Sequence, residues 1–261
     1  MILAVDIGNS ATLFGLLDRS GKLIFRSTVR TDPHSTADQC AMTLLSVFQL
    51  YGGRLSDVDG GILSSVVPPV TAAMTAAMER LTGKKPLVMG AGIRTGLDIR
   101  ADMHAQLGAD IVASCVAAIA KYPSPAIVVD MGTAVTFSVL RGNVYEGCVI
   151  LPGVRVALEA LSQRAAELPH ISLTPPADIL GHNTVDAMRS GAVYGNASMV
   201  DGMIARLEGA TAPAAAVVAT GSGAADILPY CERTIRYDPD LLLDGLYLLY
   251  QKNTEPKQRR A

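Results

Sequence analysis

Two stretches of this 261-residue chain, ILAVDIGNS at residues 2–10 and AIVVDMGTA at residues 126–134, decide the expected fold. Each is a run of apolar residues that ends in Asp, followed after one residue by Gly and then by a short polar residue. Such an apolar run is typical of a strand that is buried on both faces. The Asp-x-Gly indicates a tight turn in which glycine lets the backbone come close to a ligand. The repeat therefore predicts a duplicated α/β fold with a phosphate-binding turn in each half.

The segments around the two stretches repeat as well. In the first half we expect three strands, a helix, a strand and a helix, at 2–6, 12–18, 22–30, 36–50, 60–69 and from 70 onward. In the second half we expect three strands at 126–130, 134–140 and 143–149, helices at 153–166 and 185–208, a strand at 215–220 and a last helix at 239–252. Both halves thus follow a β-β-β-α-β-α pattern, and we expect a cleft between them. The expected domains are 1–122 and 123–261.

The sequence predicts both the N-cap and the buried face of the first expected helix, at 36–50. Ser35 precedes it and is a favoured N-cap residue. Met42, Leu45 and Phe48 recur at a spacing of three residues, and we expect them on the buried face of the helix.

Composition limits the classes of function. The chain has 22 Lys and Arg against 24 Asp and Glu, no Trp and four Phe, so neither a basic nucleic-acid surface nor an aromatic base-stacking platform is expected. No apolar run approaches the roughly 18 residues that indicate a membrane span, and no secretion signal is recognisable. The four cysteines form no CxxC pair, which favours free thiols in a cytoplasmic protein.

The Asp-x-Gly turns offer groups that bind a nucleotide. Asp6 could hold Mg²⁺ through water, because Mg²⁺ usually keeps several waters and shares its remaining positions with phosphates. Residues 8–10 can offer backbone N–H groups and short side-chain donors to phosphate oxygens, and Thr133 and Thr136 can do the same in the second half. A third glycine turn, ATGSG at 219–223, follows another strand and suits a nucleoside.

Phosphoryl transfer also needs a group that orients or deprotonates the attacking hydroxyl. Asp110 is the candidate base, because Gly108-Ala109-Asp110 opens a helix beside the irregular, glycine-containing segment 90–107. The alternative is that Asp110 only favours the positive end of the helix, and position alone does not separate the two.

Ordered motifs run along nearly the whole chain: DIGNS at 6–10, SSVVP at 64–68, TGLDI at 95–99, LGAD at 107–110, DMGTAVT at 130–136, HNT at 182–184, SGAVYG at 190–195, VATG at 218–221 and DGLYLLY at 244–250. Together they resemble the type III pantothenate kinases, a family within the superfamily of acetate kinase, sugar kinases, heat-shock protein and actin. The resemblance implies a duplicated ribonuclease H-like (actin-like ATPase) fold. It also implies ATP-dependent phosphorylation of pantothenate, the first step of coenzyme A biosynthesis.

The resemblance also implies roles for individual residues. The implied ATP site comprises Asp6, Ile7, Gly8, Asn9, Ser10, Ala11, Thr12, Leu13 and Thr133, with metal at Asp6 and a monovalent cation, K⁺ or NH₄⁺, at Asp130. The implied pantothenate site comprises Gly108, Ala109, Asp110, Ile111 and Thr184, with Asp110 as base. The family forms homodimers, and the helix that carries Thr184 helps to complete the substrate pocket across the interface.

The chain departs from the family pattern mainly on the pantothenate side. Residues that differ from the usual ones are Ala101 for Tyr, Met103 and His104 for Asn-Pro, Ile111 for Arg, Ser114 for Asn, Ser138 for Asp and Ser222 for Gly. Replacing Arg by Ile removes a fixed fork of charged donors that suits a carboxylate. Neighbours that could compensate are Arg94, Arg100, His104 and Arg155.

Three hypotheses follow from these departures. The first is an active pantothenate kinase that uses compensating residues. The second is a catalytically impaired subunit that works in a heteromer with an intact paralogue or as a regulatory binding protein. The third is a kinase for another small hydroxyl substrate, since Ala101 and Ile111 make the pocket more apolar.

Overall fold

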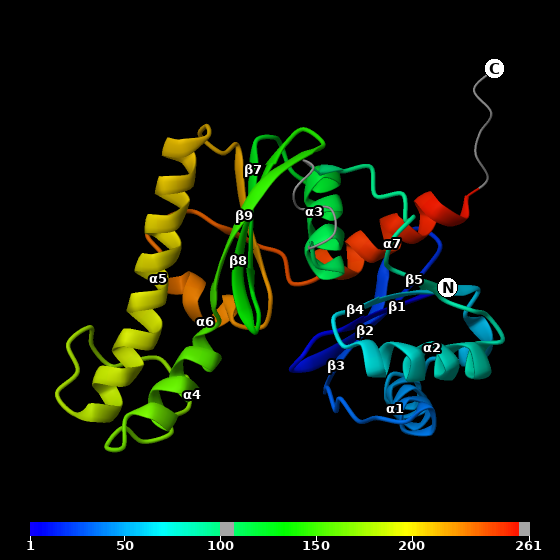
Figure 1. Ribbon diagram of the computed structural model, residues 1–261, viewed down its shortest axis with the longest axis horizontal. Helices are drawn as coiled ribbons and strands as arrows, with labels where there is room; N and C mark the ends of the chain where they lie inside the picture. The colour runs from blue at the N-terminus through cyan, green and yellow to red at the C-terminus, as the bar shows by residue number, and fades with distance from the viewer. Residues whose placement is uncertain (100–106, 256–261) are drawn as a thin grey trace. The chain divides into compact units, whose positions relative to one another are not determined.

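The computed structural model describes residues 1–99 and 107–255 (Figure 1), so Arg100, Ala101, Met103 and His104 lie outside the described residues. Contacts divide the chain into two compact units. The first comprises Met1–Gly96, Gln106–Ala117 and Leu241–Ala261, and the second comprises Leu97–Ala105 and Ala118–Asp240. The predicted division at 122/123 follows the repeated strand motif rather than these contacts and stays a prediction.

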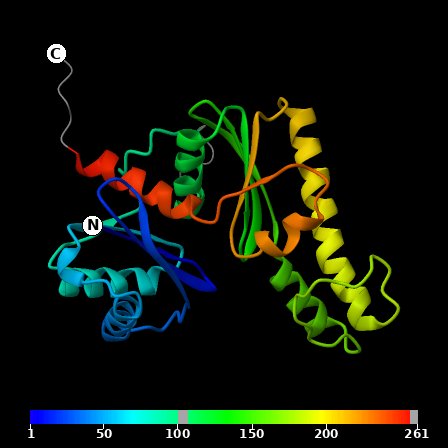
Figure 2. The same cartoon turned by 180° about the vertical axis from the view of Figure 1, so that it is seen from behind.

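The first unit is a five-stranded sheet in the order β3-β2-β1-β4-β5. Its strands are β1 (Ile2–Ile7), β2 (Ala11–Leu17), β3 (Leu23–Arg30), β4 (Gly60–Ser65) and β5 (Leu87–Val88). Strand β1 runs antiparallel to β2 and parallel to β4. Helices α1 (Ala37–Leu50) and α2 (Pro68–Thr82) pack on one face, with η1 (Leu55–Asp57) between α1 and β4 in sequence, and α7 (Leu241–Thr254) packs on the other face (Figures 1 and 2). The predicted β-β-β-α-β-α order is confirmed here.

Helix α1 differs from its prediction in both its cap and its buried face. The N-cap is Thr36 rather than Ser35, and Thr36 and Gln39 form a reciprocal capping box. Met42 is 59% exposed and Leu45 47% exposed. A strict three-residue spacing drifts around a helix of 3.6 residues per turn, so the core takes the positions that follow the helical period. The buried residues are Cys40, Ala41, Leu44, Val47 and Phe48.

The second unit repeats this sheet and adds one edge strand. Its order is β11-β10-β7-β8-β9-β6, in which β11 to β9 match β5 to β3 of the first sheet. The strands are β6 (Asp98–Ile99), β7 (Ala126–Met131), β8 (Ala134–Arg141), β9 (Val144–Pro152), β10 (Ala216–Thr220) and β11 (Arg236–Tyr237). Helices α4 (Val154–Arg164), α5 (Thr184–Ala210) and α6 (Ala224–Ile227) follow, with η3 (Leu228–Tyr230) after α6. Strand β6 differs from the prediction, because the sequence indicated an irregular segment at 90–107.

Helix α3 (Ala109–Lys121) contributes to both units, because the division falls between Ala117 and Ala118. Its buried residues include Cys115 and Ala118, whereas Ile111 and Ile119 are only partly buried. Among the described residues, no helix is both long and apolar enough to cross a membrane.

Candidate functional site

Asp6 lies where three strands of the first sheet end or begin. In the sheet register it stands opposite Leu13 of β2 and Ser64 of β4. Ser64 is fully buried, and within the described part of the chain its hydroxyl has no hydrogen-bond partner. The turn after β1 closes when Gly8 N donates to Ala11 O at 3.0 Å. Ligands of open α/β sheets bind beyond the carboxyl ends of parallel strands, which is where Asp6 and Ser64 lie.

The expected ATP-binding residues of this turn divide into exposed and buried ones. Asn9 and Ser10 are exposed at its tip, whereas Ile7 and Thr12 are buried in the strands. Thr31 N donates to Ser10 O at 3.2 Å, and the Thr12 and Thr31 hydroxyls lie 2.9 Å apart. The adjacent strand end therefore fixes the backbone of the turn, which sequence reasoning about residues 6–13 did not anticipate.

Asp130 occupies the corresponding position in the second sheet. It stands opposite Thr136 of β8 and Thr220 of β10, and both threonines are buried. Thr136 is buried in the sheet, and its possible contact with phosphate stays a prediction. The turn closes when Gly132 N donates to Ala134 O at 2.9 Å. Each sheet thus places one aspartate and a buried hydroxyl residue side by side at the ends of two parallel strands.

The glycine turn after β10 packs directly on this second Asp-Gly turn. Gly221 has φ of +91°, and a Cβ added to it would lie 2.5 Å from Asp130 Oδ1 and 2.7 Å from Met131 N. Gly223 N donates to Met131 O at 2.8 Å. Only a glycine can therefore lie against Asp130, so the sequence-predicted residues 219–223 and 130–133 form one continuous backbone surface.

Thr133 is exposed at the tip of the second turn. Gly153 N donates to Thr133 O at 2.9 Å, and a Cβ on Gly153 would lie 2.5 Å from the same oxygen. This contact ties the turn to the start of α4, for which Gly153 is the N-cap residue.

Asp110 is the second residue of α3. Its Oδ1 accepts a hydrogen bond of 2.9 Å from Ile111 N, and Val112 N donates to Gly108 O at 3.1 Å to begin the helix. This bond is what a carboxylate at a helix N-terminus makes, and it is also compatible with a second role for the carboxylate. The base assignment stays a prediction.

Two of the residues that the resemblance marks as departures from the expected pattern are buried. Ser114 is 1% exposed, and among the described residues its hydroxyl has no partner. Ser138 is 2% exposed, and its hydroxyl lies 3.4 Å from that of Tyr145. Both serines therefore belong to the interior of their unit.

Arg94, one of the expected compensating residues, is held by α7. Its NH2 donates to Lys252 O at 2.5 Å, its backbone N donates to Asn253 Oδ1 at 2.9 Å, and Asn253 Nδ2 donates to Arg94 O at 3.1 Å. These bonds direct the guanidinium to the end of a helix, where it satisfies a carbonyl group.

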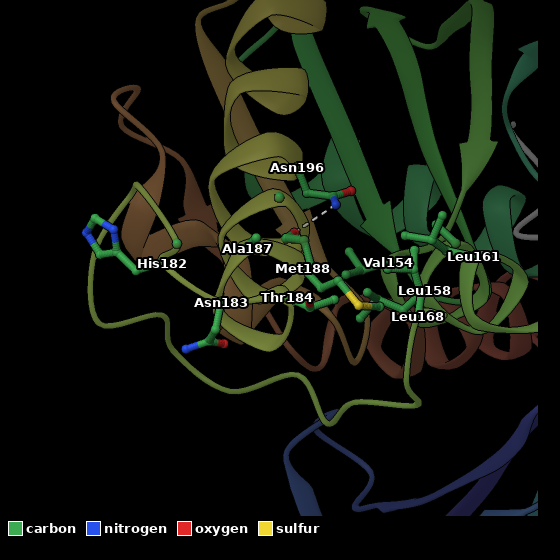
Figure 3. Close-up of a pocket in the computed structure, with 14 residues that line it drawn as sticks. Val154, Leu158, Leu161, Leu168, His182, Asn183, Thr184, Ala187, Met188 and Asn196 are labelled. Atoms are coloured by element: carbon green, nitrogen blue, oxygen red, sulfur yellow. Dashed lines mark hydrogen bonds between the residues drawn. The ribbon is translucent and has the colours of Figure 1, made fainter. Parts of the chain in front are cut away.

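Thr184 is the first residue of α5 and lines a cavity of about 720 Å³ between α4 and α5. Figure 3 shows Met188 directed toward Val154 and Leu158, while the side chain of His182 points away. The cavity is largely apolar, and no residue of the predicted ATP set lines it. No group of three or more His, Cys, Asp or Glu within the described ranges is suited to hold a metal ion.

Solved structures with the same fold cover nearly the whole chain. Component A of the (R)-2-hydroxyglutaryl-CoA dehydratase of Acidaminococcus fermentans has a TM-score of 0.55 at 14% identity, covering 97% of each chain. The activator of the 2-hydroxyisocaproyl-CoA dehydratase of Clostridium difficile, with bound ADPNP, has a TM-score of 0.55 at 12% identity, covering 97% of this chain and 94% of that one. Two mixed sheets of matching topology define the class: the duplicated ribonuclease H-like fold of the actin-like ATPases.

Sequence comparison is more specific. Residues 2–206 match the family described as Type III pantothenate kinase. The type III pantothenate kinase of Geobacillus thermodenitrificans is 40% identical over 258 residues, covering 98% of this chain and 100% of the relative. That of Listeria monocytogenes is 39% identical over 254 residues, covering 97% and 98%. The chain belongs to the type III pantothenate kinase family.

Proposed function

We propose that this protein uses ATP to phosphorylate pantothenate, the first step of coenzyme A biosynthesis. The observation that supports this most strongly is its similarity to type III pantothenate kinases along nearly the full length of both chains. The two Asp-Gly turns at strand ends are the local feature that suits a nucleoside triphosphate.

The donor groups at the two turns suit the proposed ions. A single carboxylate beside an exposed turn fits Mg²⁺, since this ion keeps several waters and takes phosphate oxygens as further ligands, so we propose Asp6 as its protein partner. When bound, Mg²⁺ would offset the negative charge of the phosphates. We propose that Asp130 binds K⁺ or NH₄⁺, and that Asn9 and Thr133 orient phosphate oxygens.

In the proposed reaction Asp110 accepts the proton of the primary hydroxyl of pantothenate as this hydroxyl attacks the γ-phosphate. Gly108, Ala109, Ile111 and Thr184 are the further proposed substrate contacts. We also propose a homodimer in which the α5 helix contributes to the substrate pocket of the partner. The free state of all four cysteines suits work in the cytoplasm.

A coupled kinase assay with pantothenate, Mg²⁺ and K⁺ or NH₄⁺ tests the proposal. Asp110→Asn should lower turnover by about 10²–10⁴-fold, the usual contribution of a positioned base. The matched control is Asp38→Asn, because Asp38 is also an aspartate that follows an alanine at the start of a helix. If Asp110 served only the helix terminus, the two variants would both keep their turnover and the assignment as base would be wrong.

The impaired-subunit hypothesis retains one supporting observation. The resemblance implies an arginine at the position of Ile111, and Arg94, one of the expected substitutes, is bonded to α7. If the wild type bound ATP without turnover, Ile111→Arg combined with Ala101→Tyr should restore activity. Failure to do so would favour a different hydroxyl substrate or a purely binding role.

A further inference from the structure

Strand β3 forms a long outer edge of the first sheet. The other edge strand, β5, has two residues, whereas β3 has eight. Natural sheets commonly shorten an edge strand, interrupt it with proline or cover it, because its outward N–H and C=O groups invite another strand. Strand β3 contains no proline, and within the described residues it pairs with β2 alone. It is therefore able to accept a further strand.

The backbone contacts of β3 show which of its groups face outward. Thr31 N, one residue beyond the strand, donates to Ser10 O on the β2 side at 3.2 Å. Successive residues of an antiparallel strand direct their N–H and C=O groups to opposite sides. Those of Val29 therefore face β2, and those of Thr28 and Arg30 face outward. Thr28 and Arg30 can thus bond to an added strand.

A groove of about 640 Å³ lies beside this part of β3 and is bounded on its other side by α1. Residues 27–30 of the strand line it, and α1 contributes residues spaced along one side of the helix: Gln39, Met42, Thr43, Ser46, Val47 and Leu50. Met42 and Leu50 are exposed apolar side chains. A peptide that extends a sheet pairs its main chain with the edge strand, while alternate side chains enter pockets beside the strand. This groove therefore suits an extended peptide with apolar side chains on the α1 side.

The charge of β3 indicates what kind of strand it would accept. The strand contains Arg26 and Arg30 and no acidic residue. Both arginines are exposed and alternate with the buried Phe25 and Ser27, so they share the face turned away from α1. Opposite charges directly across two strands attract, and like charges there are destabilising. The β3 strand of a second copy would bring further arginines to this face, whereas a strand with Asp or Glu would be complementary.

We propose that β3 and the groove beside α1 bind an extended segment of another protein, which continues the first sheet as an additional strand. Apolar side chains of this segment face Met42 and Leu50, and they alternate with acidic side chains that face Arg26 and Arg30. The docking surface lies entirely within the first unit. It goes beyond the proposed kinase activity and does not depend on it.

Fluorescence anisotropy of a short labelled peptide of alternating valine and glutamate, titrated with the full chain, tests the proposal. The wild type should bind this peptide more tightly than a second peptide in which lysine replaces glutamate. Arg30→Glu should weaken binding of the glutamate peptide by roughly two- to thirtyfold and strengthen binding of the lysine peptide, because one cross-strand pair changes from attraction to repulsion. The matched control is Lys85→Glu, which makes the same change of charge at an exposed residue of the first unit outside the groove.

Two further pairs of variants test the backbone and the apolar side of the groove. Thr28→Pro removes an outward N–H group at an edge position, where sheets tolerate proline, and should weaken peptide binding by about tenfold or more. Thr28→Ala keeps the N–H group and should bind as the wild type does. Leu50→Ala should weaken binding by roughly tenfold. Leu45→Ala should not, because Leu45 is also exposed on α1 but does not line the groove.

Three results would each overturn the proposal. The first is a wild type that does not bind the glutamate peptide up to about 1 mM, the weak end of specific affinities. The second is equal binding of the glutamate and lysine peptides. The third is wild-type affinity in both Thr28→Pro and Leu50→Ala. If β3 paired with a second copy of the chain instead, the wild type would not take up the peptide, and Thr28→Pro would lower the mass of the protein in sedimentation.

Discussion

Replacing Gly221 by alanine should disrupt the second Asp-Gly turn, although the substitution adds only one methyl group. The added Cβ would lie 2.5 Å from Asp130 Oδ1 and 2.7 Å from both Met131 N and Met131 C. Ordinary contacts of a Cβ begin near 3.4 Å. The Met131 atoms belong to the backbone of a central strand, so they cannot move aside without shifting β7.

The expected free-energy change has two parts. A side chain at the positive φ of Gly221, +91°, costs about 1–2 kcal/mol in steric strain. Overpacking against the strand backbone adds about 1–3 kcal/mol. Gly92 separates the two parts, because its φ is +92° and a Cβ added to it meets nothing within 4 Å. Gly92→Ala should therefore show the strain alone.

Thermal unfolding of the two variants measures the difference. At about 2–4 °C per kcal/mol, Gly221→Ala should melt about 2–12 °C below Gly92→Ala. ATP binding, followed by titration, should weaken only in Gly221→Ala, because the clash pushes on Asp130. If the two variants melted at the same temperature and bound ATP equally, the close packing of the glycine turn on Asp130 would be refuted.

Three further predictions concern stability, each read from thermal or denaturant unfolding. Thr36→Ala should lower the free energy of unfolding by about 1 kcal/mol, because it removes the side-chain acceptor of the α1 capping box. Ser35→Ala should leave it nearly unchanged. Equal effects of the two variants would contradict the observed cap. Leu44→Ala should lower the free energy of unfolding by about 2–5 kcal/mol, because Leu44 is fully buried. The adjacent Leu45→Ala should lower it by less than about 0.5 kcal/mol, because Leu45 is 47% exposed. The reverse order would support burial at the three-residue spacing. Asp238→Asn should cost about 1–3 kcal/mol at pH 7, and the loss should shrink as the pH falls below about 4, where the carboxylate of the unfolded wild-type chain is protonated first and that of the folded chain at lower pH.

The pH dependence of the last prediction follows from the surroundings of Asp238. Burial is the largest influence and opposes ionisation, but Lys121 Nζ at 2.6 Å and the Tyr122 hydroxyl at 2.7 Å together hold its pKa below the usual value. A carboxyl whose pKa is lower in the folded state stabilises the fold above its unfolded pKa. That stabilisation is lost as the pH falls through the folded pKa. A constant difference between wild type and variant from pH 7 to pH 3 would contradict this account.

The sequence was sufficient to predict the duplicated sheets because the strands that form them are buried on both faces. The apolar runs at residues 2–7 and 126–131 lack the polar/apolar alternation of a half-exposed strand, and their short length and the glycine that follows favour a buried strand over a helix. Helix α1 was less predictable, since Met42 and Leu45 are as apolar as the residues that are buried beside them. The choice of face depends on packing against α2, which the local pattern does not contain.

The candidate site was predictable in its residue types but not in its contacts. Asp6 and Asp130 could be chosen because glycine turns follow apolar strands. That Gly221 presses on Asp130, or that Ser64 lies beside Asp6, depends on the register of strands distant in sequence. That α4 begins beside the second turn depends on the contact of Gly153 with Thr133, which nothing in the sequence indicates.

The two Asp-Gly turns that suggested a duplication are no longer equivalent in structure. The first has four residues, Gly8–Ala11, between its last paired strand residues, whereas the second has three, Gly132–Ala134. The second turn also carries the glycine turn at Gly221 against its aspartate, which restricts the space around that carboxylate. Neighbouring backbone holds both turns, through Thr31 N to Ser10 O in the first and through Gly153 N to Thr133 O in the second. The duplicated fold thus supplies two Asp-Gly turns that differ in length and in the backbone packed against them.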